Sequence, residues 1–171
     1  MPDFNQIACN FGSSRLESQM RFIAEVDKVK QVLRRTLLTD KSRRENDAEH
    51  SWHLALMAPV LQEYAAEPFN MEHVLKMVIF HDLIEVYAGD TFAFDKTGNL
   101  DKEEREKAAA DKLFAILPPE QGSEFRALWE EFDAMETPSA KYAAAMDRIQ
   151  PYLHYTLTDG HTWVEGKPSI G

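Results

Sequence analysis

The sequence predicts an all-α fold, a single-domain bundle of five to seven helices over residues 1–171. Apolar residues recur every three to four positions over most of the chain, which is the period of an amphipathic helix. No stretch shows a convincing alternation of apolar and polar residues, the pattern of a half-buried strand. A length of 171 residues suffices for one domain with a well-developed core and is short for two.

Six helices account for the periodic stretches. Their expected ranges are 13–38, 47–66, 71–87, 101–118, 120–135 and 138–157. Asn46 or Asp47 is a suitable N-cap for the second helix, Gly89 ends the third, and Pro118-Pro119 ends the fourth. Irregular structure is expected in a basic loop (39–44), in the stretch 90–99, and in a tail rich in Gly, Thr and Pro (158–171).

The composition favours a soluble protein of the cytoplasm. The formal net charge of −10 repels polyanions, so neither a nucleic-acid polymer nor an anionic membrane surface is expected as a partner. The single cysteine, Cys9, cannot form an intrachain disulfide, which fits a reducing compartment. The segment Met1 to Gln6 lacks the basic and apolar regions of a signal peptide. No apolar stretch reaches the roughly 18 residues that span a bilayer.

Three of the predicted helices carry ionisable side chains in line with their apolar faces. In the second helix, His50 begins a core-facing row of apolar residues. In the third, Asp82 and Glu85 share the apolar face, and His81 lies on its edge. In the last, Asp147 follows a face of small alanines that lets other helices come close. Because a buried carboxylate is costly unless it is paired or binds a metal, these residues are candidates for a functional site.

Two imidazoles and two carboxylates suit a borderline divalent cation with room left for water. Such an ion lowers the pKa of a bound water and can supply hydroxide near neutral pH. Taken one by one, these residues have plainer explanations, because a lone histidine is more often structural and a His-Asp dipeptide is common by chance. Their occurrence together on three amphipathic helices favours a site for one divalent transition metal. The candidates are Mn, Co, Fe, Ni and Zn.

Three segments resemble the H…HD…D signature of the HD-domain superfamily. They are Ala48-Glu49-His50-Ser51, the stretch from His81 to Asp90, and Met146-Asp147. The middle stretch has the pattern His-Asp-x-x-Glu-x-x-x-Gly-Asp, which is far more specific than the dipeptide alone. The chain is similar to the bacterial 5′-deoxynucleotidase branch over a metal-binding core of about 33–157. The resemblance implies a single HD domain with a mononuclear metal site, and frequently a homodimer.

The resemblance also assigns roles to six acidic and imidazole side chains. The metal ligands that it implies are His50, His81, Asp82 and Asp147. Glu85 and Asp90 match the acids that the family places beside the ligands. Hydrolysis of a phosphate monoester needs a group that orients or deprotonates water and an acid for the leaving alkoxide. We expect Glu85 on the side of the water and Asp90 on the side of the leaving group.

Positive charge for a phosphate is concentrated just before His50. The four arginines of this region are Arg34, Arg35, Arg43 and Arg44. The planar fork of arginine suits phosphate oxygens. Aligned on His50, Arg35 matches the arginine that the nucleotidases use on the substrate phosphate, and Arg43 resembles a second family position. The family arginine is followed by tryptophan and Arg35 by Thr36, which leaves the sugar preference open.

The expected function is that of a metal-dependent phosphohydrolase, which removes the 5′-phosphate from (deoxy)nucleoside monophosphates by attack of a metal-activated water. The expected partner is therefore a small phosphorylated substrate.

Two alternatives stay open. One is an HD-type phosphodiesterase on a cyclic or dinucleotide substrate. Binuclear members generally take further histidines from between the His-Asp pair and the last aspartate, and residues 83–146 contain none. The other is a metal-stabilised binding module without activity, although all six site positions match. His53 lies one turn from His50, which would allow it a ligand role, but it is assigned none; His73, His154 and His161 match no motif position.

Overall fold

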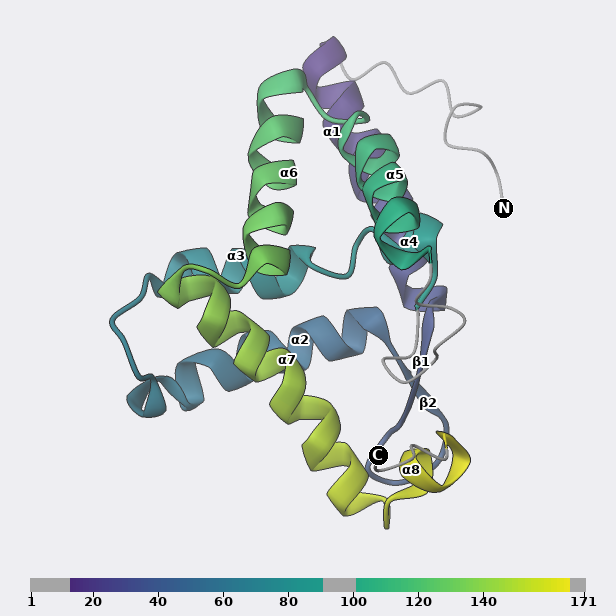
Figure 1. Cartoon of the computed structure of the whole chain (residues 1–171). Coiled ribbons are helices and arrows are strands. Elements are labelled where there is room, and N and C mark those ends of the chain that lie inside the picture. The colour runs from purple at the N-terminus through teal and green to yellow at the C-terminus, as the bar shows by residue number, and fades with distance from the viewer. Residues whose placement is uncertain (1–12, 91–100, 167–171) are drawn as a thin grey trace.

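Six helices of ten residues or more form the described part of the chain, which confirms the predicted all-α class (Figure 1). They are α1 (Ser14–Val26), α2 (Asp47–Val60), α3 (Met71–Phe80), α5 (Lys102–Phe114), α6 (Pro119–Ala134) and α7 (Pro138–Leu157). The computed structural model describes residues 13–90 and 101–166, apart from the side chains of Trp163 and Glu165. The expectations for Met1 to Gln6, for Cys9 and for most of the stretch 90–99 lie outside these residues.

The first predicted helix, 13–38, was wrong in its second half. Helix α1 ends at Val26, a 3₁₀ helix η2 follows (Asp27–Gln31), and strand β1 (Leu33–Leu37) pairs antiparallel with β2 (Arg44–Asn46). The sequence pattern placed Leu33 in the buried stripe, but its side chain is 56% exposed. The helical period therefore stops near Val29, which is buried, and the chain turns back through a loop with Lys41 in the left-handed region.

The third predicted helix, 71–87, is interrupted. Helix α3 ends at Phe80, residues 81–84 form turns, and the short helix α4 (Glu85–Ala88) ends at Gly89, whose φ of +74° suits glycine. The Leu83 amide bonds to the Phe80 carbonyl, a tighter connection than that of an α-helix. The interruption puts His81 and Asp82 at the end of α3, where the chain changes direction.

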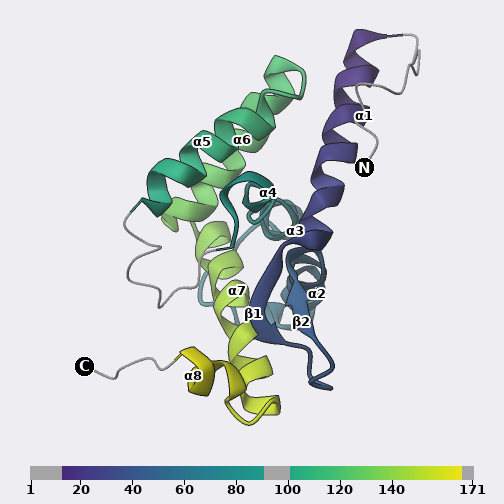
Figure 2. The same cartoon turned by 90° about the vertical axis from the view of Figure 1, so that its right-hand side faces the viewer.

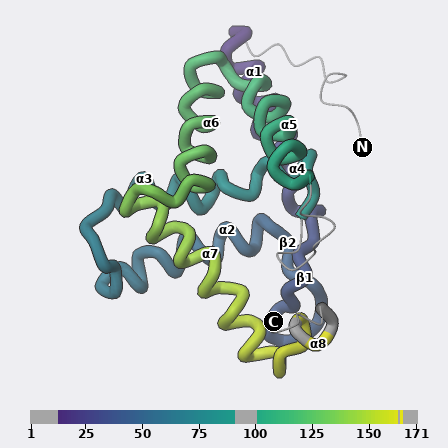
Figure 3. Tube along the Cα trace, in the orientation of Figure 1, coloured from purple at the N-terminus to yellow at the C-terminus, as the bar shows by residue number. Residues whose placement is uncertain are grey.

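The helices enclose two apolar cores that meet at α6. The first core joins α2, α3, α6 and α7 and includes Leu128, whereas the second joins α1, η2, α5 and α6 and includes Trp129. In Figure 1, α1, α5 and α6 lie above α2 and α7, and the tube in Figure 3 follows α2, α3 and α7 as they converge. Ala140 and Ala143 of α7 are fully buried, so their small side chains let α3 pack closely.

The C-terminal segment contains a helix where an irregular tail was predicted. Helix α8 (His161–Gly166) packs against β1, beside the end of α7 (Figure 2). Its Thr162 is fully buried and donates to the Arg35 carbonyl at 3.4 Å, and this buried contact holds the segment in place. No described helix has the length and apolar character needed to cross a membrane. The predicted location in the cytoplasm stays a prediction.

Candidate metal centre

Three helices bring the four predicted metal ligands together. His50 lies one turn into α2, His81 and Asp82 follow α3, and Asp147 lies in α7; each of these helices packs on the other two. The His50 Nε2 to Asp147 Oδ1 distance is 2.9 Å, and His81 Nε2 lies 3.2 Å from Asp82 Oδ1. Each histidine also lies near the other carboxylate. His81 Nε2 is 3.6 Å from Asp147 Oδ1, and His50 Nε2 is 3.9 Å from Asp82 Oδ2.

Helix capping fixes the position of His50. The Asn46 side chain accepts from the Glu49 amide and the Glu49 carboxylate accepts from the Asn46 amide, a capping box that starts α2. His50 therefore lies at a defined height on the first turn, and its side chain is fully buried.

Hydrogen bonds turn the Nε2 atoms of both histidines toward the carboxylates. His81 Nδ1 lies 3.1 Å from the Val78 carbonyl, which can only accept, so the proton of the neutral ring is on Nδ1. His50 Nδ1 lies 3.0 Å from Gln150 Oε1 and is the donor for the same reason. Each Nε2 then carries a lone pair that faces acidic oxygens, and His81 Nε2 is buried without a hydrogen-bond partner. A divalent cation placed between the two imidazoles and the carboxylates would bind the lone pairs of both.

Without a metal, protons must take its place. Burial lowers the pKa of His81, but the nearby carboxylates of Asp82 and Asp147 outweigh burial and raise the pKa to about 10. Burial raises the pKa of Asp82 and of Asp147, but the neighbouring histidines, and Arg34 beside Asp82, hold both well below their usual value. The metal-free cluster therefore keeps two carboxylates charged beside a protonated His81.

A buried arginine and a second group of acids lie against the ligands. Arg34 Nη1 donates to Asp82 Oδ2 at 2.7 Å and to Asp47 Oδ1 at 3.3 Å. Burial, followed by the charge of Asp82, raises the pKa of Asp47 to about 7. Burial and the charges of Asp82 and Asp47 raise the pKa of Glu85 well above its usual value, so the metal-free site favours the protonated form of this carboxyl. Burial also raises the pKa of Asp90, which feels the charges of Arg34 and Asp82.

Of the two arginines assigned to phosphate, Arg43 pairs with Glu49 and not with a predicted metal ligand. Arg43 is half exposed and forms a two-pronged ion pair with Glu49, with Nη1 to Oε2 at 2.9 Å and Nη2 to Oε1 at 2.5 Å. Arg35 follows Arg34 in β1, whose pairing with β2 is irregular between Leu33 and Leu37. The guanidinium that contacts a predicted ligand belongs to Arg34.

Sequence reasoning missed three polar residues around the ligands. Asp47 appeared only as a possible helix cap, yet it lies three residues before His50 and so on the same face of α2. Gln150 lies three residues after Asp147 in α7 and orients His50. Glu45 is 1% exposed in β2, a segment for which no strand was expected. The spacing of Asp47 and Gln150 is a signal that the sequence does contain.

A second group of possible ligands lies on the other side of Gln150. Glu45, His53 and His154 each offer one ligand atom, and these three atoms lie within 4.8 Å of one another. Gln150 Nε2 lies 2.6 Å from Glu45 Oε1, 3.2 Å from His154 Nε2 and 3.3 Å from His53 Nδ1. Burial, followed by the charge of His154, lowers the pKa of His53, so His53 is neutral at pH 7.

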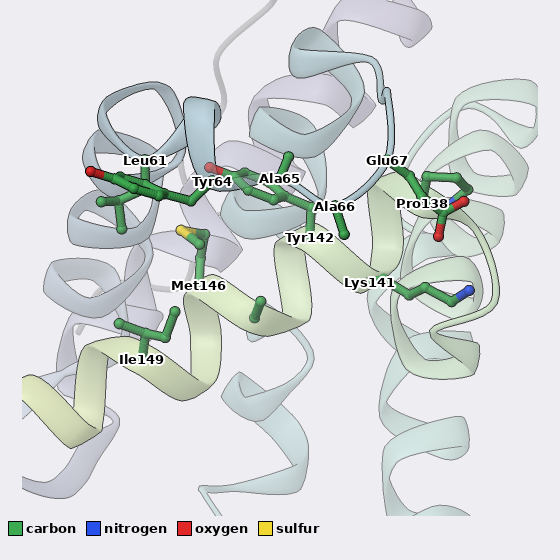
Figure 4. Close-up of a pocket in the computed structure, with 11 residues that line it drawn as sticks. Leu61, Tyr64, Ala65, Ala66, Glu67, Pro138, Lys141, Tyr142, Met146 and Ile149 are labelled. Atoms are coloured by element: carbon green, nitrogen blue, oxygen red, sulfur yellow. The ribbon is translucent and has the colours of Figure 1, made fainter.

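An apolar cavity of about 390 Å³ opens between the 3₁₀ helix η3 (Gln62–Tyr64) and α7 (Figure 4). Tyr64, Tyr142 and Ile149 line it, and Lys141 lies at one end. No predicted site residue lines this cavity, so it does not identify the substrate.

Comparisons with known proteins agree with this geometry. A model of the HD domain family matches residues 26–170. The chain is 31% identical over 140 residues to a 5′-deoxynucleotidase of Yersinia pestis (strain Pestoides F), covering 77% of this chain and 70% of that protein. It is 26% identical over 156 residues to the 5′-deoxynucleotidase HDDC2 of Danio rerio, covering 90% and 74%. A crystal structure described as a predicted metal-dependent phosphohydrolase, from Magnetospirillum magnetotacticum MS-1, superposes with a TM-score of 0.85 at 55% identity and covers 90% of this chain and 76% of that one.

Proposed function

Since the chain belongs to the HD domain family, we propose that it is a metal-dependent phosphohydrolase that removes the 5′-phosphate from (deoxy)nucleoside monophosphates. One observation carries the proposal: two buried imidazoles, held by hydrogen bonds on Nδ1, turn their Nε2 atoms toward two carboxylates. Relatives named 5′-deoxynucleotidases support the class of substrate.

His50, His81, Asp82 and Asp147 would hold the metal. When bound, a borderline divalent ion acidifies a coordinated water and offsets the negative charge of a phosphate. Gln150 and the Val78 carbonyl keep the two imidazoles in the tautomer that leaves Nε2 free. Arg34 pairs with Oδ2 of Asp82, and its charge helps to keep this carboxylate ionised.

Glu85 and Asp90 would move the protons. With the metal site filled, Glu85 would be in its charged form and would accept a proton from the attacking water. The bond between water oxygen and phosphorus forms as the bond between phosphorus and the 5′-oxygen breaks. The raised pKa of Asp90 suits the acid that gives its proton to the departing 5′-oxygen. The charge of Asp47 also raises the pKa of Glu85, which suits a group that has to accept a proton.

Arg35 and Arg43 stay the proposed contacts of the substrate phosphate. The geometry of Arg43 supports this role, because its guanidinium is half exposed and donates from both terminal nitrogens to the Glu49 carboxylate. A dianionic phosphate in place of the Glu49 carboxylate would meet the same two donors.

A substrate panel with defined metals tests the proposal. Protein stripped of metal and reloaded with manganese or cobalt should release phosphate from nucleoside 5′-monophosphates and leave cyclic nucleotides intact. Hydrolysis of cyclic or dinucleotide substrates alone would favour the phosphodiesterase, and no turnover of any monoester would favour the binding module.

Single substitutions test the roles. Glu85→Gln should keep the metal and lose at least about 100-fold in kcat, because a proton-transfer group contributes on that order. His81→Ala should lose the metal at this site. Glu131→Gln is a matched control, because Glu131 pairs with His73 outside the cluster. Normal turnover by Glu85→Gln would refute the assignment.

We further propose a homodimer formed through an apolar face of α2 and α7. The outer row of α2 and η3 is exposed at a spacing of four residues: Trp52 is 67% exposed, Leu56 49%, Val60 65% and Tyr64 75%. Ile149 and Leu153 continue the apolar surface on α7, and the cavity between Tyr64 and Ile149 links the two rows. An exposed apolar surface of this kind is typical of an association site, and a second copy would cover it.

A further inference from the structure

The cluster around Gln150 contains more hydrogen-bond acceptors than donors. His154 Nδ1 donates to the Leu37 carbonyl at 2.9 Å, so His154 Nε2 carries a lone pair. The amide group of Gln150 supplies two N–H donors, and it faces Glu45 Oε1, His154 Nε2 and His53 Nδ1. The second oxygen of Glu45 is buried and has no hydrogen-bond partner. Three acceptor atoms therefore share the two N–H groups of Gln150, and a fourth, Glu45 Oε2, has no donor.

We propose that Glu45, His53 and His154 form a second cation site, which takes a borderline divalent metal such as Zn²⁺. A ligand set of two imidazoles and one carboxylate binds zinc in preference to magnesium or calcium. Glu45 is 1% exposed, and a buried carboxylate needs a positive charge or a full set of donors. His50 Nδ1 lies 3.8 Å from Glu45 Oε2, too far for a hydrogen bond.

The three side chains of the triad could bind an ion after small movements of the ligand atoms. Gln150 Nε2 lies close to one atom of each proposed ligand, so it marks the centre of the triad. Tetrahedral zinc holds its ligands at about 2.0–2.2 Å, so the ligand atoms, now within 4.8 Å of one another, would close to roughly 3.4 Å. The Gln150 side chain has to turn away, and the ion then satisfies the lone pairs that its amide faced.

This site is separate from the first. It joins β2 through Glu45, α2 through His53 and α7 through His154, and shares no proposed ligand with the first cluster. Gln150 connects the two sites, because its Oε1 accepts from His50 while its Nε2 occupies the triad. Filling the second site removes the acceptor of His50, so the two sites are expected to influence each other's affinity.

Metal stoichiometry tests the proposal. Zn²⁺ is titrated into chelator-stripped protein by calorimetry, and bound zinc is counted by elemental analysis. Wild type should bind two ions per chain, and His53→Gln should bind one. His73→Gln, which changes a histidine paired with Glu131, should bind two and is the matched control. His81→Ala should keep the ion at the second site.

The outcomes separate this site from the proposed hydrolase. A wild type that binds one ion, or a His53→Gln variant that still binds two, would overturn the second site and leave a hydrogen-bonded network around Gln150. Failure to hydrolyse any phosphate monoester would count against the hydrolase alone, since the zinc count does not depend on turnover. A measurement on the unmodified protein guards against misfolding: the second equivalent of Zn²⁺ should protect His53 from diethyl pyrocarbonate, and unprotected His53 would overturn the proposal.

Discussion

The two histidines of the metal cluster carry the chemistry of the site at the scale of single residues. Their rings have the same tautomer for different reasons, since His50 donates to a side-chain amide and His81 to a backbone carbonyl. The backbone acceptor of His81 lies on its own helix, so it is set as soon as α3 forms. Gln150 comes from a different helix, so the orientation of His50 depends on the packing of α7 against α2.

Metal affinity should rise with pH. The raised pKa of His81, about 10 without metal, means that its ring is protonated at neutral pH and has no lone pair on Nε2. Since the metal must displace this proton, affinity should increase by about tenfold per pH unit below that pKa. A competition titration against a chelator of known protonation, between about pH 6 and 9, measures the slope. Affinity that does not change with pH would show that His81 binds no proton that the metal displaces.

Removing the buried arginine should destabilise the metal-free protein strongly. Arg34→Met keeps an apolar stem but leaves Asp47 without its counter-charge and Asp82 with His81 alone, and the loss of one partner of a buried ion pair costs about 3–5 kcal/mol. Urea unfolding of stripped protein measures the change. Arg21→Met, which breaks an exposed pair with Glu17, is the control and should cost under about 1 kcal/mol. Equal losses in the two variants would contradict this account.

At the scale of elements, the long periodic helices were predictable and the interruptions were not. Helices α2, α5, α6 and α7 lie within a few residues of their expected starts, because caps and prolines mark their ends. The β hairpin was missed because Leu33 fits a helical stripe by spacing although it is exposed, and only pairing with Asn46 makes it a strand. The break after Phe80 leaves an apolar helical pattern intact, so periodicity could not reveal it.

The candidate site shows the same division. His50, His81, Asp82 and Asp147 lie close together because they lie on, or directly after, three helices that pack on one another, and their role as metal ligands stays a prediction. Arg34 and its neighbour Arg35 could not be distinguished, because the direction of an arginine in a strand depends on register, and the strand itself was not expected.

The capping box of α2 should matter for metal binding as well as for stability. Asn46→Ala removes a cap, at a cost of about 1 kcal/mol, and loosens the turn that holds His50. Zinc affinity should therefore fall along with the urea midpoint. Asn70→Ala removes the cap of α3, three turns before His81, and should lower stability by a similar amount with unchanged affinity. Parallel losses of affinity in both variants would mean that the cap acts only through global stability.

At the scale of the whole molecule, the two cores position different parts of the metal cluster. The first core packs α2, α3 and α7 against one another and so fixes the distances between the ligands. The second core buries Leu83 and Ile84, which directly follow Asp82, against α5 and α1. The turn that carries His81 and Asp82 is thus held from both sides, and α6 contributes to each core.

The apolar face of α2 and α7 lies outside both cores and should be covered by a second copy of the chain. We expect sedimentation velocity to give about twice the 19.6 kDa of one chain. Val60→Lys places a charge in the middle of the exposed row and should yield a monomer that still binds metal, since Val60 lies more than two turns beyond His50. Ile23→Lys, at an apolar position of α1 that is 58% exposed, is the control and should remain dimeric. If wild type and both variants sediment as one species of single-chain mass, this face does not join two copies.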